Sequence, residues 1–163
     1  MALATEAETT LESHSYYNRA LEMIHRNRYS AALDQLIEAL RIAPGNPVYR
    51  SYFGLCLAHA ERDYDRAIRA CKQAIMTFSK DPVFRVNLGK VYKLQGDNAS
   101  AYKEFIRAWE LNNEHPSTAA ELTRMGIRRP PFFTFLRRQH PVNRYLGIVR
   151  AYLERTLVGR RQS

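Results

Sequence analysis

The sequence predicts an all-α fold in which successive pairs of helices stack into a solenoid. Three observations support this prediction. The chain of 163 residues aligns with itself at a spacing of 34–35 residues, which is typical of repeated helix pairs. Small residues recur at fixed places in each copy, where two helices would need to approach closely. Proline lies between the copies, where it ends one helix and accompanies the turn into the next.

Residues 1–12 precede the first copy, and we expect them to form a flexible N-terminal lead. They contain Glu6, Glu8 and Glu12 and no Lys or Arg. A signal peptide would begin with basic residues and continue into an apolar segment. We therefore expect a chain that is not exported, and no apolar run approaches the roughly 20 residues that a membrane-spanning helix needs.

The solenoid is predicted to span residues 13–126, with three copies at about 13–46, 47–81 and 82–115. Each copy is expected to be two helices joined by a short turn. The aligned positions in the first helices are Ala20, Gly54 and Gly89, followed by Met23, Leu57 and Tyr92. Those in the second helices are Tyr29, Tyr64 and Asn98, then Ala32, Ala67 and Ala101, then Leu36, Cys71 and Phe105, then Ala39, Ala74 and Ala108. Residues four apart share one helix face, which predicts a packed interface within each pair.

The ends of the helices are marked by turn residues. Pro44 and Gly45 close the first copy, and Pro47 and Pro82 lie near the starts of the next first helices. A missing amide hydrogen costs little in the first turn of a helix. These positions therefore support the boundaries of the copies.

Residues 116–126 are predicted to form a helix that caps the solenoid. Thr118 and Glu121 match a capping box, and Gly126 matches a C-terminal stop. The last repeat of a solenoid leaves an apolar face that needs a cover, which this helix would provide.

Residues 127–163 form an Arg-rich extension with a predicted helix at about 141–157. Residues 116–163 contain ten Arg against two acidic residues, whereas residues 1–115 contain 15 Lys and Arg against 14 Asp and Glu. The basic and aromatic residues of interest are Arg128, Arg129, Phe132, Phe133, Phe135, Arg137, Arg138 and Arg144. Four interpretations are open: packing on the solenoid, docking on a second copy to form a homodimer, binding an anionic membrane surface, or binding RNA.

The repeated pattern resembles the tetratricopeptide repeat (TPR). The third copy carries it most fully, with Leu88, Gly89, Tyr92, Gly96, Asp97, Ala101, Phe105 and Ala108. The resemblance covers about residues 13–115 and implies a right-handed α-solenoid of three repeats with C-terminal capping helices. The Trp expected near each repeat start is replaced by Tyr16, Arg50 and Arg85.

The resemblance also implies a concave groove, lined by the first helices, that binds a peptide or a partner helix. The residues expected to line it are Tyr17, Leu21, Ile24, Ser51, Leu55, Ala58, Val86, Asn87, Lys90 and Lys93. Such a groove would be apolar with a cationic end. For each of these residues, packing between helices is the alternative.

Some members of the family clamp the C-terminal carboxylate of heat-shock chaperones. Asn18, Asn87 and Lys90 are the candidates for such a clamp in this chain. The first helix lacks the required Lys, and Tyr52 stands where the middle Asn would be. We therefore do not expect that activity.

No catalytic, metal or cofactor site is expected. The chain has no glycine-rich phosphate loop, no G-x-S-x-G and no H-E-x-x-H. Cys56 and Cys71 are expected to be buried small hydrophobic residues. His25 and His59 occupy equivalent repeat positions, but no third ligand accompanies them.

These observations favour a non-enzymatic, cytoplasmic adaptor or scaffold for protein–protein interaction. Two alternatives remain. The Arg-rich extension could bind nucleic acid or an anionic membrane. The chain could also be a secretion-type chaperone, because class II chaperones of type III secretion have a similar length and three such repeats, although they are usually acidic and this chain has a net charge of +9.

Overall fold

A computed structural model describes residues 2–126 of the chain, and their side chains from residue 8 onward. The chain divides into two units, residues 1–121 and 122–163. The fold of the first unit is described below, together with the few described residues of the second.

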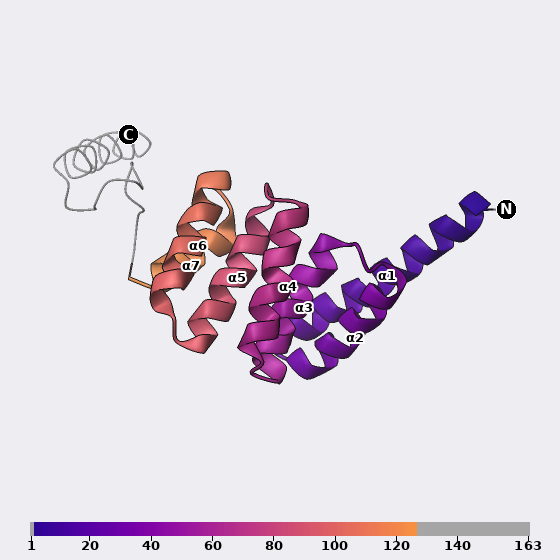
Figure 1. Ribbon diagram of the computed structural model, residues 1–163, viewed down its shortest axis with the longest axis horizontal. Helices are drawn as coiled ribbons and strands as arrows, with labels where there is room; N and C mark the ends of the chain where they lie inside the picture. Colours follow the sequence, from indigo (N-terminus) through magenta and orange to yellow (C-terminus); the bar gives the residue numbers. More distant parts are fainter. Residues whose placement is uncertain (1, 127–163) are drawn as a thin grey trace, which may run out of the picture. The chain divides into compact units, whose positions relative to one another are not determined.

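The described residues form helices and turns, which confirms the predicted all-α class. The helices are α1 (Ala2–His25), α2 (Tyr29–Ile42), α3 (Pro47–Ala60), α4 (Tyr64–Thr77), α5 (Pro82–Gln95), α6 (Asn98–Leu111) and α7 (Pro116–Arg124), as Figure 1 shows.

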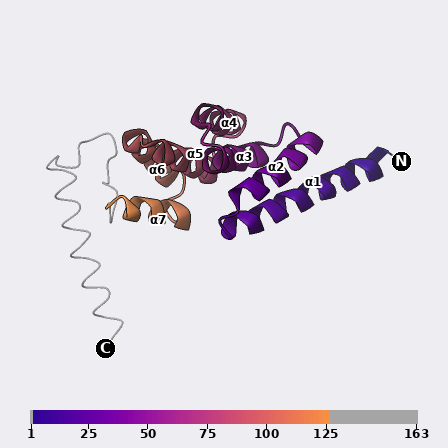
Figure 2. The ribbon, with the colours of Figure 1, turned by 90° about the horizontal axis from the view of Figure 1, so that it is seen from below.

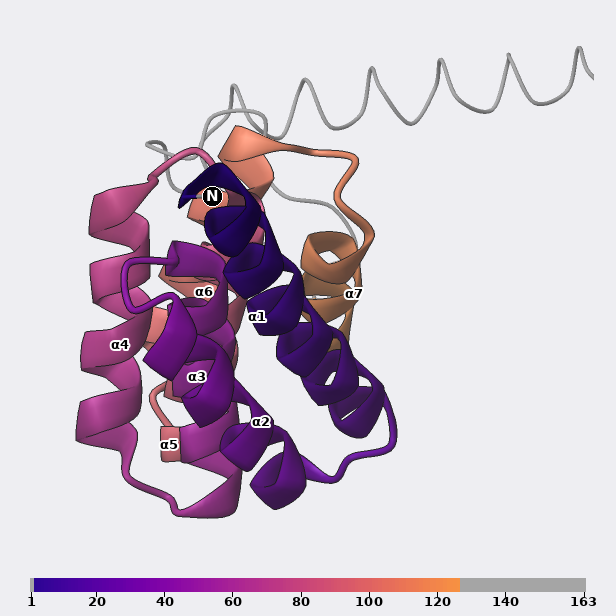
Figure 3. The same ribbon diagram turned by 90° about the vertical axis from the view of Figure 1, so that its right-hand side faces the viewer.

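The helices of the first unit stack as three pairs in chain order. Helix α1 packs on α2, α3 on α4 and α5 on α6, and each second helix also contacts the first helix of the next pair. Helices α3 and α5 are neighbours as well. Helices α1 and α4 lie on opposite sides of α3, as Figures 2 and 3 show. The middle pair, α3 and α4, therefore contacts helices that come before and after it in the sequence.

Residues 2–12, which the sequence predicts as a flexible lead, belong to helix α1 in the structure. They contain no proline or glycine and are rich in Ala, Glu and Leu, which are good helix formers. The hydroxyl of Ser13, where the first copy was expected to begin, lies inside this helix and donates to the carbonyl of Thr10 at 2.9 Å.

Small residues lie where the two helices of a pair meet. The recurring alanines are fully buried, namely Ala20, Ala32, Ala39, Ala67, Ala74, Ala101 and Ala108. A Cβ atom on Gly54 would lie 2.7 Å from the carbonyl oxygen of Ala67 and 2.7 Å from the sulfur of Cys71. A Cβ atom on Gly89 would lie 2.5 Å from the ring of Phe105. The contact therefore excludes even a methyl group at these two positions.

The two cysteines are part of this core and form no disulfide. Cys56 and Cys71 are both completely buried, as the sequence predicts. Burial raises the pKa of each thiol to about 12, because a thiolate is poorly solvated in an apolar interior.

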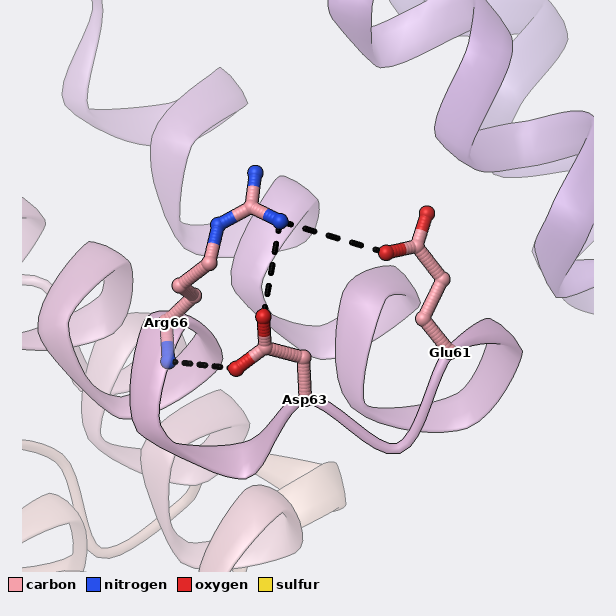
Figure 4. Close-up of polar contacts among 3 residues, drawn as sticks. All are labelled: Glu61, Asp63 and Arg66. Atoms are coloured by element: carbon pink, nitrogen blue, oxygen red, sulfur yellow. Dashed lines mark hydrogen bonds and ion pairs between the residues drawn. The ribbon is translucent and has the colours of Figure 1, made fainter.

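Four helices begin with a side chain that caps their free amides. Asn46, Asp63, Asp81 and Asp97 accept backbone hydrogen bonds at the starts of α3, α4, α5 and α6. At the start of α4, Asp63 accepts from the Arg66 amide at 3.1 Å and pairs with its guanidinium at 3.4 Å (Figure 4). This ion pair is largely exposed and contributes at most about 1 kcal/mol, so the backbone cap matters more.

A nearly buried carboxylate joins the helices of the third pair. Glu104 on α6 accepts from Arg85 on α5 at 3.0 Å and also pairs with Arg107. Arg85 stands where the repeat pattern has Trp. An ion pair between the helices therefore lies where the pattern would place a ring.

Helix α7 begins at Pro116, so the predicted capping box is wrong. Thr118 lies within the helix, where its hydroxyl contacts the His115 imidazole at 3.2 Å. Glu121 pairs with Lys93 of α5 at 3.1 Å. Gly126 has a positive φ of 79° and donates to Thr123, in agreement with the predicted stop.

The contact at Gly54 makes a direct prediction for stability. We expect Gly54→Ala to lower the free energy of unfolding by about 1–3 kcal/mol, because the new methyl group meets the backbone of α4. Gly45→Ala is the matched control, since nothing lies within 4 Å of its Cβ position. Urea unfolding measures both, and equal values for the two variants would contradict the close approach.

Candidate functional site

The residues predicted to line a groove lie on the first helices of all three pairs. They come from α1 (Tyr17, Leu21, Ile24), α3 (Ser51, Leu55, Ala58) and α5 (Val86, Asn87, Lys90, Lys93). Five of them are at most 3% exposed, namely Ser51, Leu55, Ala58, Val86 and Asn87. The others are partly or fully exposed. The surface available to a partner is therefore richest on α1 and at the lysines of α5.

Two of the buried residues hold α3 and α5 together. The amide nitrogen of Asn87 donates to the Ser51 hydroxyl at 3.0 Å, and the Cys71 thiol donates to the Ser51 carbonyl at 3.5 Å. A buried amide without a partner would cost about 1–3 kcal/mol. The Asn87 side chain thus makes an interhelical hydrogen bond at a position that the carboxylate clamp would need.

The cationic end of the predicted groove is partly neutralised. Lys93 is 39% exposed, but its ammonium lies 3.1 Å from the carboxylate of Glu121, whose side chain is 5% exposed. Sequence reasoning placed Glu121 in a capping box and so missed this pair, whose partners are 28 residues apart.

An aromatic cluster that the sequence did not reveal joins α1 to α3. The ring of Tyr17 lies 5.1 Å from that of Tyr49 and 5.6 Å from that of Tyr52. His14 lies 6.0 Å from Tyr49 in an edge-to-face arrangement. The buried Tyr49 hydroxyl is satisfied by the His14 imidazole at 2.8 Å and by Ser13 at 3.4 Å. The buried Tyr49 therefore holds a fixed position next to the partly exposed Tyr17, which in turn contacts Tyr52.

The rings of Tyr17 and Tyr52 are neighbours, and burial changes the ionisation of both phenols. Burial raises the pKa of Tyr17, and the neighbouring Tyr52 raises this pKa further. Burial also raises the pKa of Tyr52, to which Asp81 contributes. Asp81 is the N-cap of α5, and its Oδ1 accepts from the Val83 amide at 2.8 Å. The sequence signal for Asp81 was its place directly before Pro82.

A separate hollow of about 500 Å³ lies where the turn between α1 and α2 meets the end of α3. Residues Asn27 to Ala31, Asp34, His59 and Ala60 line it. The His59 ring stacks on Tyr29, with 3.7 Å between centroids and 3° between planes. Burial and then the charge of Lys90 lower the pKa of His59. His25, its equivalent in the first copy, is exposed and does not line this hollow.

Metal-binding clusters and membrane-spanning helices are both absent from the described part of the chain. Within residues 2–126, no group of three or more His, Cys, Asp or Glu is placed to hold a metal ion. None of the helices in that range is both long and apolar enough to cross a bilayer.

The basic and aromatic residues of the extension, from Arg128 to Arg144, lie outside the described residues, as does the helix predicted at about 141–157. Their roles therefore stay predictions from the sequence.

Comparison with known proteins identifies the repeats. The tetratricopeptide repeat family model matches residues 58–124. TPR repeat-containing protein MJ1428 of Methanocaldococcus jannaschii is 24% identical over 60% of this chain, which spans only 17% of that protein. Photosystem I assembly protein Ycf3 of Cyanophora paradoxa is 27% identical over 77% of this chain and 71% of that protein.

Solved structures show the same fold. The second TPR domain of human RPAP3, in complex with the HSP70 peptide SGPTIEEVD, has a TM-score of 0.57 and 16% identity over 75% of this chain and 99% of that one. The Yersinia enterocolitica chaperone SycD, in complex with a peptide of the translocator YopD, has a TM-score of 0.55 and 19% identity over 71% of this chain and 88% of that one.

The stacked His59 predicts a dependence of stability on pH. Its folded-state pKa lies below the ordinary value of 6.5, so the unfolded chain binds more protons as the pH falls through that value. The stabilisation is present above pH 6.5 and decreases below it. We expect the midpoint of thermal unfolding to fall less between pH 7.5 and 5.5 in His59→Phe, which keeps a ring on Tyr29 but cannot be protonated. Equal falls in the two proteins would show that His59 is not responsible.

Proposed function

Because the chain belongs to the tetratricopeptide repeat family, we propose that it is a non-enzymatic adaptor for protein–protein interaction. Its first helices would bind a peptide or a partner helix, and the location would be the cytoplasm. Stacked repeats provide an extended surface rather than an enclosed catalytic cleft. A fold alone does not fix a function, so the proposal rests on what the surface of the first helices offers.

The observation that carries the proposal is the exposed part of these first helices. Tyr17, Leu21 and Ile24 follow one another along α1. Their side chains are largely apolar, and all three remain partly exposed. Apolar side chains at i, i+4 and i+7 form one stripe, which suits the anchor residues of an extended or helical segment. The structural neighbours RPAP3 and SycD were solved with peptides bound, which supports a similar use of the fold.

The buried residues set a limit on the proposed contacts. Leu55 and Val86 are 3% and 2% exposed, so a charged residue there would disturb the core before it disturbed a partner. The proposed contact surface is therefore centred on the exposed side chains of α1, together with Lys90 and Lys93 on α5.

The proposal predicts that a charge on α1 weakens partner capture. Full-length chain with Leu21→Glu should retain less than about a tenth of the partner protein captured from source lysate by the wild type. The reason is that burying an unpaired carboxylate against an apolar anchor is strongly unfavourable. Quantitative mass spectrometry of nuclease-treated captures measures the difference.

Met76→Glu is the matched control, because Met76 is 85% exposed on the second helix α4. It should capture as much partner as the wild type, and circular dichroism should show that both variants are folded. Equal capture by Leu21→Glu and the wild type would contradict the proposal. Capture that disappears on nuclease treatment would instead indicate nucleic-acid binding by the Arg-rich extension.

A further inference from the structure

The beginning of α1 lies beyond the packed part of the solenoid. Helix α1 has 24 residues, whereas each helix from α2 to α6 has 14. Its N-terminal part projects past the neighbouring helices, as Figures 1 and 2 show. Residues 2–12 are called the α1 overhang below. All five side chains from Glu8 to Glu12 are exposed, and Leu11 is 74% exposed. The overhang therefore presents a helix surface that packing within the first unit leaves open.

The α1 overhang is acidic. Residues 1–18 contain three Glu and no Lys or Arg. Glu8 and Glu12 are four residues apart and share one side of the helix, where like charges repel each other. Neither forms an ion pair with a described residue, and Arg41 of α2 pairs with Glu38 at 2.9 Å.

An apolar side chain borders these two carboxylates. Leu11 is next to Glu12 in the sequence and three residues after Glu8, which makes it a neighbour of Glu8 on the helix surface. Covering an exposed leucine is favourable because it removes apolar area from water. A partner that suits the α1 overhang therefore supplies cations together with an apolar side chain.

The sequence of the Arg-rich extension has this complementary chemistry. Residues 127–163 contain nine Arg, no Lys and a single acidic residue, Glu154. Three Phe within residues 132–135 stand between two pairs of Arg, at 128–129 and 137–138. A guanidinium can donate two parallel hydrogen bonds to one carboxylate, which a lysine ammonium cannot do. These residues lie outside the described part of the chain, and the match is one of sequence and charge.

We propose that residues 128–138 of the Arg-rich extension bind the α1 overhang of a second copy of this chain. In this contact, arginine side chains pair with Glu8 and Glu12, and a phenylalanine ring covers Leu11. The contact goes beyond the proposed function, because it lies outside the peptide surface around Leu21 and has this chain itself as the partner.

The position of the overhang determines the kind of assembly. Helices α1 and α6 lie at opposite ends of the first unit, as Figure 1 shows. The two surfaces in the contact are different, so the contact is heterologous and joins copies head to tail. Each copy that binds through its extension still has a free overhang. The assembly therefore grows with protein concentration unless it closes into a ring.

The same contact stabilises the overhang. The exposed side chains from Glu8 to Glu12 give this part of α1 little packing of its own. A helix shorter than about 12–15 residues is marginal in water without packing. Neutralising Glu8 and Glu12 removes their mutual repulsion, and covering Leu11 adds apolar contact. Binding and helix formation at the overhang therefore support each other.

Two complementary variants of the full-length chain test the contact. The first variant carries Glu8→Lys and Glu12→Lys and keeps its extension. The second variant keeps its overhang and reverses the four arginines of the proposed segment, with Arg128→Glu, Arg129→Glu, Arg137→Glu and Arg138→Glu. Sedimentation velocity of nuclease-treated protein measures the size of the particles. The wild type should self-associate at low salt, and each variant alone should have a self-association Kd raised by more than about tenfold, because attraction is replaced by repulsion.

An equimolar mixture of the two variants tests the head-to-tail geometry. The first variant still offers an intact extension, and the second still offers an intact overhang. The mixture should therefore form a heterodimer with one contact and nothing larger. The remaining overhang and the remaining extension of that heterodimer are both reversed in charge and cannot add a further copy.

Asp65→Lys combined with Glu114→Lys is the matched control. Both residues are exposed and lie outside the overhang, and the double change alters the net charge by the same amount as the first variant. This control should self-associate like the wild type, and circular dichroism should show that all variants are folded. Raising the NaCl concentration from about 0.05 M to about 0.5 M should weaken the association of the unaltered chain, because salt screens exposed charges.

Several outcomes would overturn the head-to-tail contact. A wild type that stays monomeric at about 100 μM would do so, as would a mixture that stays monomeric or a control that loses association. Association of the second variant alone would indicate that overhangs pair with each other, and association of the first alone that extensions do. Association that disappears on nuclease treatment would indicate nucleic acid as the partner. All of these leave the peptide surface, which Leu21→Glu tests, unaffected.

Discussion

The stacking of the three helix pairs depends on how closely each first helix approaches the second helix of its own pair. At Gly54 the approach brings the space for a Cβ atom within 2.7 Å of a backbone carbonyl, and at Gly89 within 2.5 Å of the Phe105 ring. A large ring on α6 is matched by the smallest residue on α5, whereas the first pair uses Ala20. Protein interiors are packed as densely as organic crystals. The size of the side chain on one helix therefore limits the size of the side chain that faces it on the other. The spacing of the pairs in turn determines which side chains of α3 and α5 remain at the surface.

Polar contacts across the pairs complete what the apolar contacts begin. Asn87 and Ser51 join α3 to α5, and Arg85 joins α5 to Glu104 of α6. Each of these groups is buried enough that an unmade hydrogen bond would be costly. Directional hydrogen bonds of this kind set the register between neighbouring helices. Apolar contacts alone would define this register less well. The third pair therefore keeps its geometry with an ion pair in place of the ring that the repeat pattern has at that position.

The helices could be predicted from the sequence because their determinants recur three times in one chain. Alanine, glycine and proline at equivalent positions predict the same helix boundaries and close contacts in each copy. A wrong assignment in one copy is therefore corrected by comparison with the others. The candidate site could be predicted less well, since it is made where the copies differ. Whether Leu55 lines a groove or fills the core depends on the separation of α3 from its neighbours, and helical periodicity carries no information about that distance. Tyr17 of α1 meets Tyr49 and Tyr52 of α3, and the Lys93–Glu121 pair spans 28 residues. Such contacts are set by tertiary packing alone.

The two cysteines of the second repeat have a consequence for the chemistry of the folded chain. Only a thiolate attacks an electrophile or an oxidant efficiently, and burial raises the pKa of both thiols to about 12, so very little thiolate forms at neutral pH. Both sulfur atoms are also completely covered by neighbouring side chains. Alkylation of Cys56 or Cys71 therefore requires α3 and α4 to separate first. The rate at which a thiol reagent labels the native chain therefore reports how often its middle repeat opens. The two natural cysteines make this measurement possible without introducing a new residue.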